Sequence, residues 1–296
     1  MALPHTHIAS SAGFQTLLVA TDFSSRSLKA LSCAAALART SNAKVVVAHV
    51  VSPDSWHIVP PTELHPALCH ERRNVERKLA RLIKAGGLDD VRTDTVIKEG
   101  DFRQTLCRIA CEQKADLLVA STHGRKGLLK LLLGSKVEEV CHRAPCPVLL
   151  VGPRVRDASQ LDFRRVLYVT DLTPLSLAAL PLVLAFAAQH RAKLTVARIL
   201  PQQTPERADD VEFALAQTRN EVVPAITQRA GLVAEPDFEV FRGPVKDSIL
   251  QIASETNADL IGVGSHRPGQ LAVYLPGDLA YDIATDARCP VLTIVD

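Results

Sequence analysis

The sequence predicts an α/β protein made of two copies of one doubly wound domain, each a five-stranded parallel sheet with helices on both faces. Three observations lead to this fold class. The chain has 296 residues, enough for two separate cores at roughly 100–200 residues per domain. Segments of its first half recur in its second half in the same order. Within each half, apolar runs typical of buried strands alternate with segments of helical periodicity.

The composition supports this fold class and excludes others. Only 4% of the residues are aromatic although 47% are hydrophobic, so small and β-branched residues must form the cores, as they do where helices pack on parallel strands. The 22% of charged residues argues against a disordered chain. With 34 basic and 32 acidic residues, the whole-chain charge carries no polyanion-binding signature.

The sequence shows no signal for export or for a membrane span. The most apolar stretch, residues 175–188, contains Pro181 and is shorter than the roughly 20 residues that a span requires. Residues 1–13 have neither a basic segment nor an apolar core typical of a signal peptide. Seven cysteines without a disulfide-like spacing indicate reduced thiols. We therefore expect a cytoplasmic protein with no membrane or nucleic-acid partner.

Two pairs of segments define the internal repeat. FQTLLVATDF at 14–23 resembles FRRVLYVTDL at 163–172, an offset of 149 residues. Residues 98–124 align without gaps to 241–267, an offset of 143, with eight identities in 27 positions. The six-residue difference predicts an insertion in the first copy, between its second and third strands. We place it in residues 52–68.

The first copy contains five expected strands separated by helices. The strands are expected at residues 16–21, 44–51, 91–98, 116–120 and 147–151, and the helices at 24–40, 66–85, 102–113 and 136–142. Apolar residues recur at helical spacing in the helices, and two glycines at 86–87 provide a stop signal. The order implies right-handed parallel crossovers. The second copy repeats it after the polar join at 152–162, and we divide the chain into domains at 1–156 and 157–296.

A candidate ligand site follows the first and fourth strands. Ligands of doubly wound sheets bind beyond the carboxyl ends of the strands, at the switch point. Asp22 follows the first strand, and Ser121 and Gly124 follow the fourth, with Gly134 and Ser135 ten and eleven residues beyond Gly124. Glycines in a loop that runs into a helix N-terminus offer backbone N–H groups and a positive dipole end to phosphates.

These segments resemble the universal stress protein family. The strand that ends in TDFS, the segment STHGRKGLLKLLLGS and the closing CPVLLV carry the resemblance, and the two copies cover nearly the whole chain. The family's nucleotide-binding signature is Gly, two residues, Gly, nine residues, then Gly followed by Ser or Thr. Gly124, Gly134 and Ser135 match it, and Ser121 stands in place of the first glycine. The Ser121 side chain either crowds the ligand or hydrogen-bonds to it.

The resemblance implies a Rossmann-like, adenine nucleotide alpha hydrolase-like fold and a set of nucleotide-binding residues. By this resemblance Asp22 and Val50 would lie near adenine and ribose, and Ala120 with Ser121 would line the base pocket. The remaining candidates are the residues around the phosphates and two that flank the strand ends: Gly124, Gly134, Ser135, Lys136, Val137, Ala20 and His123. His123 either contacts the ligand or is a solvated loop residue.

The implied ligand is ATP, with or without Mg²⁺, and the implied role is a sensor or regulator in stress adaptation. Asp22 is the only carboxylate that the sequence places near the site, and the resemblance puts it at the nucleoside end. We therefore expect slow hydrolysis at most, and assign no catalytic residue. The family also implies that the last strand of each copy, at 148–151 and 291–295, pairs within the chain and buries two sheet edges. A further homodimer is left open.

The second copy departs further from the signature. Arg267 stands where the second glycine belongs, and Asp278 follows Gly277 in place of Ser or Thr. A side chain at 267 blocks close approach of a ligand to the backbone, and a carboxylate at 278 repels phosphate. The sequence thus predicts one competent site at most, in the first copy.

Two alternatives remain at this point. Ser135 and Glu138 form a capping-box pattern, and Asp22 or Ser24 can cap the first helix, so the chain could be a scaffold that binds proteins and no nucleotide. The other alternative is a zinc site. Its weak candidate ligands are His65, Cys69 and His70, with a further ligand still required.

Overall fold

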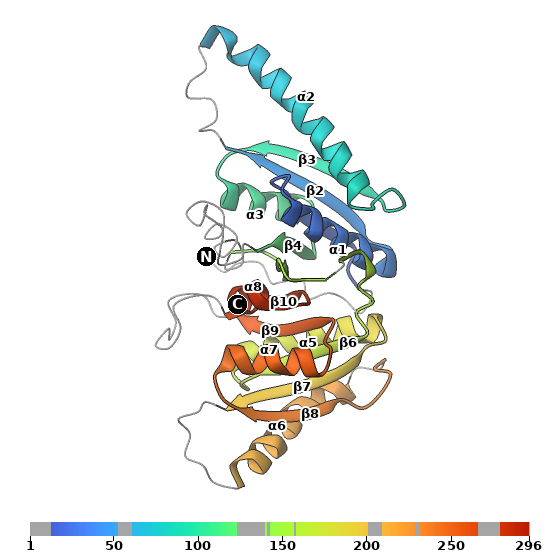
Figure 1. The fold of residues 1–296 in the computed structure, drawn as a ribbon, viewed down its shortest axis with the longest axis vertical. Helices are drawn as coiled ribbons and strands as arrows, with labels where there is room; N and C mark the ends of the chain where they lie inside the picture. Colours follow the sequence, from blue (N-terminus) through green and yellow to red (C-terminus); the bar gives the residue numbers. More distant parts are fainter. Residues whose placement is uncertain are drawn as a thin grey trace.

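The structure is a computed structural model that describes residues 13–52, 61–122, 140, 143–156, 158–200, 209–228, 231–265 and 279–295. Its strands form one continuous ten-stranded sheet in the order β3-β2-β1-β4-β5-β10-β9-β6-β7-β8. The molecule is elongated, with the first copy at one end and the second copy at the other (Figure 1).

Each copy contributes five mutually parallel strands. Those of the first copy are β1 (Thr16–Ala20), β2 (Lys44–Val51), β3 (Thr93–Glu99), β4 (Leu117–Ser121) and β5 (Val148–Val151). Those of the second are β6 (Arg165–Thr170), β7 (Lys193–Leu200), β8 (Asp237–Arg242), β9 (Leu260–Ser265) and β10 (Val291–Val295). The central strands are almost wholly buried, as expected of a parallel sheet covered on both faces.

The helices divide between the two faces of the sheet. One core contains buried side chains of α1 (Ser25–Ser41), α2 (Pro61–Ala85), α5 (Pro174–Gln189) and α6 (Asp209–Thr227). The core on the other face contains those of α3 (Phe102–Glu112), α7 (Val245–Glu255) and α8 (Leu279–Asp286). A short 3-10 turn, η2 (Ala158–Gln160), lies between the copies. The predicted α/β fold with two doubly wound units is confirmed.

The extra length of the first copy is helical. We expected the second helix to begin at about residue 66, but α2 begins at Pro61. It has 25 residues, whereas its counterpart α6 has 19, so much of the inserted segment extends a helix. The helix expected at 136–142 lies outside the described residues except for position 140.

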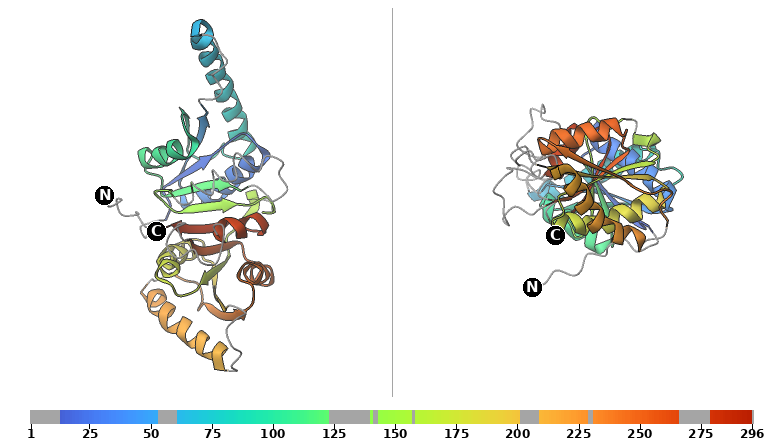
Figure 2. Two further views of the ribbon diagram at one scale, coloured as in Figure 1. Left: turned by 90° about the vertical axis from the view of Figure 1, so that its left-hand side faces the viewer. Right: turned by 90° about the horizontal axis from the view of Figure 1, so that it is seen from below.

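The two copies join through an antiparallel pair of buried strands, β5 and β10. Val291 lies opposite Leu150, and Leu292 opposite Leu149, and all four side chains are at most 1% exposed. The expected pairing of the last strands is thereby confirmed. Because the pair is antiparallel, β5 and β10 run in opposite directions where the two copies meet. Seen from below, the strands of the sheet fan out in a strong twist (Figure 2, right).

At Gly152, directly after β5, the backbone passes too close to α8 for a side chain to fit. A Cβ on Gly152 would lie 1.8 Å from the carbonyl oxygen of Ala284 in α8. Lys29 of α1 donates to the carbonyl oxygens of Pro153 (2.8 Å) and Val155 (3.0 Å). The linker is therefore held by a helix of each copy.

Gly152→Ala is expected to loosen this junction. The added methyl group meets a backbone carbonyl, which can give way only if the chain shifts, so we expect a loss of about 3 kcal/mol or more in the free energy of unfolding. Urea unfolding of the full chain measures it. Gly87→Ala is the comparison, because there the added atom meets nothing closer than 3.6 Å and the positive φ alone should cost about 1 kcal/mol. Equal losses would contradict this account of the junction.

A buried histidine lies in an aromatic cluster of the second copy. His190 is 4% exposed, and its ring stacks on Phe186 at 4.4 Å and lies 5.2 Å from Phe163. Neither ring nitrogen has a hydrogen-bond partner among the described residues. Burial, together with the charge of Arg164, lowers the pKa of His190 from 6.5 to about 4.

Acid should therefore destabilise the protein through His190. The unfolded chain takes up this proton near the ordinary pKa, whereas the folded chain does so only near pH 4, so stability is lost as the pH falls from about 6.5 towards 4. Between about pH 7 and pH 5 this loss should amount to roughly 2 kcal/mol. The measurement is urea unfolding across this range. His190→Phe keeps an aromatic ring but cannot titrate, so it should remove this part of the pH dependence. An unchanged pH dependence in this variant would refute the role of His190.

Candidate functional site

The turns that follow β1 and β6 have the same hydrogen bonds. The hydroxyls of Thr21 and Ser27 lie 2.9 Å apart, and those of Thr170 and Ser176 lie 3.0 Å apart. Each threonine hydroxyl also accepts a hydrogen bond of 3.0 Å from the backbone N–H two residues on. This bond supports Phe23 and its counterpart Leu172, which both have φ of 63°, a conformation that bulky side chains rarely adopt.

The aspartate of each turn is held in the same way. Asp22 accepts the backbone N–H of Ser24 at 3.0 Å, and Asp171 accepts that of Thr173 at 3.0 Å. Partial burial acts to raise the pKa of Asp22, but hydrogen bonds from Ser24 and Ser27 outweigh it, so the pKa lies below its usual value. The pKa of Asp171 is lowered for the corresponding reasons. Both carboxylates are therefore ionised at neutral pH.

Ser24 is the residue that caps α1. Its side chain accepts the N–H of Ser27 at 3.2 Å, and Thr173 does the same for α5 at 3.3 Å. Of the two capping residues that the sequence allowed, Ser24 is correct. Asp22 instead positions the N-cap residue, which leaves its carboxylate at the carboxyl edge of the sheet beside a helix N-terminus.

Three further side chains gather at this edge in the first copy alone. His49, near the end of β2, places Nδ1 2.8 Å from the carbonyl oxygen of Thr21. Its ring lies 4.5 Å from that of Phe23, and Lys78 of α2 holds Nζ 5.6 Å from the Phe23 ring centre. In the second copy Leu172 replaces the phenylalanine. Arg198, at the position of His49, instead donates to Gln217 at 2.8 Å.

None of these three residues was predicted from the sequence as part of the site. The position of His49 at a strand end was a signal that could have found it. The contacts of Phe23 and Lys78 arise only when α2 packs over the first turn.

The ends of β4 and β9 differ in the space available for a side chain. At Gly264 in β9, a Cβ would lie 2.8 Å from the Leu175 carbonyl oxygen and 2.8 Å from Ser176 Cα. The N-terminus of α5 thus fills the space over Gly264. The aligned residue in the first copy is Ser121, whose side chain is half-buried, so β4 and α1 leave room for a side chain. The next residue, Thr122, is fully buried, and its hydroxyl has no partner among the described residues.

The structure brings the described candidate residues to one edge of three adjacent strands. Asp22 is exposed, Ala120 is buried, and the other three are half-buried: Ala20, Val50 and Ser121. They come from β1, β2 and β4, which pair in the order β2-β1-β4. The remaining candidates lie outside the described residues: His123, Gly124, Gly134, Ser135, Lys136 and Val137.

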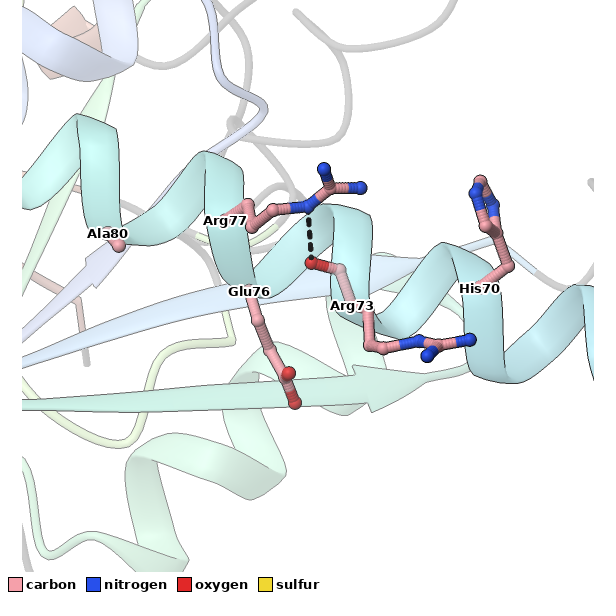
Figure 3. A pocket seen from close by; sticks show the side chains of 5 residues that line it. All are labelled: His70, Arg73, Glu76, Arg77 and Ala80. Carbon is pink, nitrogen blue, oxygen red and sulfur yellow. Dashed lines mark hydrogen bonds between the residues drawn. The ribbon is translucent and has the colours of Figure 1, made fainter.

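In the described parts of the chain, no group of three or more His, Cys, Asp or Glu side chains could hold a metal ion. The side chains of the candidate zinc ligands His65 and Cys69 lie outside these parts. His70 is exposed and lines a hollow of about 640 Å³ along α2, shared with Arg73, Glu76, Arg77 and Ala80 (Figure 3).

Among the helices that the structure describes, none is both long enough and apolar enough to cross a bilayer.

Comparison with known proteins agrees with the two-copy architecture. The sequence model of the universal stress protein family matches residues 13–152 and again residues 162–294. A universal stress protein of Thermus aquaticus is 32% identical over 138 residues, which are 47% of this chain and 98% of that protein. The universal stress protein Mb2028c of Mycobacterium bovis is 26% identical over 85% of this chain and 87% of its own length.

A solved structure shows the same fold over nearly the whole length. A universal stress protein from Archaeoglobus fulgidus superposes with a TM-score of 0.70 at 19% identity, covering 95% of this chain and 98% of that one. Since the family's sequence model accounts for most of both halves, the chain belongs to the universal stress protein family and contains two domains of that family in tandem.

Proposed function

We propose that the N-terminal domain, residues 1–156, binds ATP at the carboxyl edge of β2, β1 and β4, and that the C-terminal domain, residues 157–296, does not. In this proposal nucleotide occupancy makes the protein a cytoplasmic sensor or regulator in stress adaptation. The observation that carries it is a difference between the ends of β4 and β9 beside two similar turns. At the edge that holds Asp22, the end of β4 accommodates the half-buried side chain of Ser121, whereas α5 packs directly over the corresponding Gly264.

Asp22 is suited to the nucleoside end of the ligand. One carboxylate oxygen holds the turn through Ser24, and the lowered pKa keeps the group ionised. An ionised carboxylate accepts strong hydrogen bonds from hydroxyl donors such as those of ribose. The Thr122 hydroxyl, buried at the base of the glycine loop without a described partner, offers a further polar group at this edge.

The phosphate end of the proposed site rests on the signature residues Gly124, Gly134, Ser135 and Lys136. Glycine allows the backbone N–H groups to approach phosphate closely, and the helix that follows contributes its positive dipole end. A Mg²⁺ ion bound with the phosphates would neutralise part of their charge.

Hydrolysis should be slow at this site. A general base works best when its pKa lies near the operating pH, and the pKa of Asp22 is lowered further from neutrality by its hydrogen bonds. The arrangement favours retention of the nucleotide over turnover.

A universal stress protein solved in complex with cAMP aligns to 45% of this chain with a TM-score of 0.36, too distant a match to assign a ligand here. The alternative, a protein-binding scaffold without nucleotide, draws on Ser121 in place of the first signature glycine and on residues of the edge that serve the fold, as Ser24 does by capping α1.

The matched substitutions Asp22→Asn and Asp171→Asn test the proposal. Both keep an oxygen that can accept the backbone N–H of the turn, and both remove the charge. We expect Asp22→Asn to weaken Mg-ATP binding at least about tenfold, since a hydrogen bond to a charged group contributes about 1.5–3 kcal/mol. Asp171→Asn should leave binding unchanged. Isothermal titration of nucleotide-free protein measures affinity and stoichiometry.

Each other outcome has a distinct meaning. About two ATP per wild-type chain would refute the single-site proposal. Equal losses in both variants would show that the turns act on the fold. No nucleotide bound to the wild-type chain, either in titration or released from freshly purified protein on denaturation, would favour the scaffold.

A further inference from the structure

The near-neutral charge of the whole chain hides a separation of charge between its two ends. Helix α2 carries six Lys and Arg residues against three Glu, a net charge of +3. Its counterpart α6 carries one Arg against four acidic residues, a net charge of −3. These two helices lie at opposite ends of the molecule (Figure 1). The net charge of +2 is therefore a poor description of either end.

The cations of α2 lie along one side of the helix. Its inward side is marked by Val75, Leu79 and Leu82, which are 1%, 1% and 8% exposed. At 3.6 residues per turn, the opposite side presents four exposed basic residues at intervals of four, four and three: Arg73, Arg77, Arg81 and Lys84. We call these four residues the α2 cation line. It is about 17 Å long at 1.5 Å per residue.

Within the described stretch 72–85, no acidic residue occupies a position of the α2 cation line. Glu76 lies to one side of it and forms an ion pair with Arg72 at 3.2 Å. The sticks of Figure 3 show Arg73 and Arg77 on neighbouring turns, where Arg77 Nε donates to the Arg73 carbonyl oxygen at 3.4 Å. Three of the four residues are arginines, whose planar forks match phosphate oxygens in pairs.

The helix is also accessible. It lies beyond β3, the edge strand of the first copy, and part of it projects past the end of the sheet (Figures 1 and 2). An α-helix with its side chains is about 10–12 Å across, close to the width of about 12 Å of the major groove of B-form DNA. The α2 cation line lies on the stretch whose opposite side packs into the core, and its four side chains are exposed on the outward side, where a duplex can meet them.

We propose that the α2 cation line is a docking surface for the phosphate backbone of double-stranded DNA, bound without sequence specificity. Phosphate contacts from Arg and Lys give affinity without reading bases. The described part of α2 bearing the line has no exposed Phe, Tyr or Trp, the residues on which single-stranded bases stack. Duplex RNA fits less well, because its major groove is deep and narrow.

An anionic membrane fits the surface less well than DNA does. A helix that lies on a bilayer inserts apolar side chains into it, whereas the apolar side chains of this stretch, Val75, Leu79 and Leu82, pack into the protein core. In the second copy, the described helix α6 carries a single basic residue, Arg219. The exposed side of α6 instead presents Phe213 and Val223, 70% and 41% exposed, so a single end of the molecule would contact DNA.

Fluorescence anisotropy of the full chain with a labelled DNA duplex of about 20 base pairs tests the proposal. We expect a dissociation constant of about 10⁻⁴–10⁻⁶ M near physiological salt, and a slope of about −3 to −4 for log K against log salt, since each of four phosphate contacts contributes about −0.9. The triple variant Arg73→Gln, Arg77→Gln, Arg81→Gln should bind at least about tenfold more weakly and have a slope near −1. Glutamine preserves helix propensity.

The control has the same net charge as the triple variant. Lys114→Gln, Arg191→Gln, Arg288→Gln removes three exposed cations from other parts of the surface, and it should bind duplex DNA as the wild-type chain does. All measurements are made without nucleotide, so their outcome is independent of ATP binding.

Four results would overturn the proposal. They are no anisotropy change with wild-type protein at low salt, an equal loss of affinity in the control, affinity for single-stranded DNA or duplex RNA equal to that for duplex DNA, and binding to phosphatidylserine vesicles without binding to the duplex.

Discussion

The antiparallel pairing of β5 with β10 is the constraint on which the rest of the molecule depends. Each five-stranded sheet ends in an apolar strand, and an unpaired strand of that kind exposes backbone N–H and C=O groups that promote association with other chains. Pairing the two edges removes both from solvent and merges two cores into one continuous sheet. It also directs the linker past α8 at Gly152, where only hydrogen fits.

Comparing the turns after β1 and β6 distinguishes residues that maintain the fold from residues that could bind a ligand. Thr21, Ser24 and Ser27 make the same hydrogen bonds as Thr170, Thr173 and Ser176, so these residues are accounted for by the turn and the helix cap. The differences are His49, Phe23 with Lys78, and the room at Ser121. The second copy can therefore serve as an internal comparison, because it keeps the hydrogen-bonded turn without these differences.

The two copies also differ in a pair of helices that take no part in the junction between them. The helices α2 and α6 occupy equivalent places in the topology, far from the shared β5–β10 junction, and each buries only one side. Their outward sides are free to differ, and they do so in charge and in length. Because these outward sides are not packed against the joined sheet, one helix can become basic without changing the junction.

The sequence by itself determined the repeat, the order of strands and helices, and the edge at which the candidate residues meet. These depend on periodicity, on turn residues close in the chain and on the rule that ligands bind at strand ends. The start of α2 was misplaced: it was expected at residue 66 and lies at Pro61, within the segment that the repeat marks as inserted. Tertiary structure alone decided that α5 packs over Gly264 and that Lys78 covers Phe23. These contacts join residues tens of positions apart, and only packing brings such residues together.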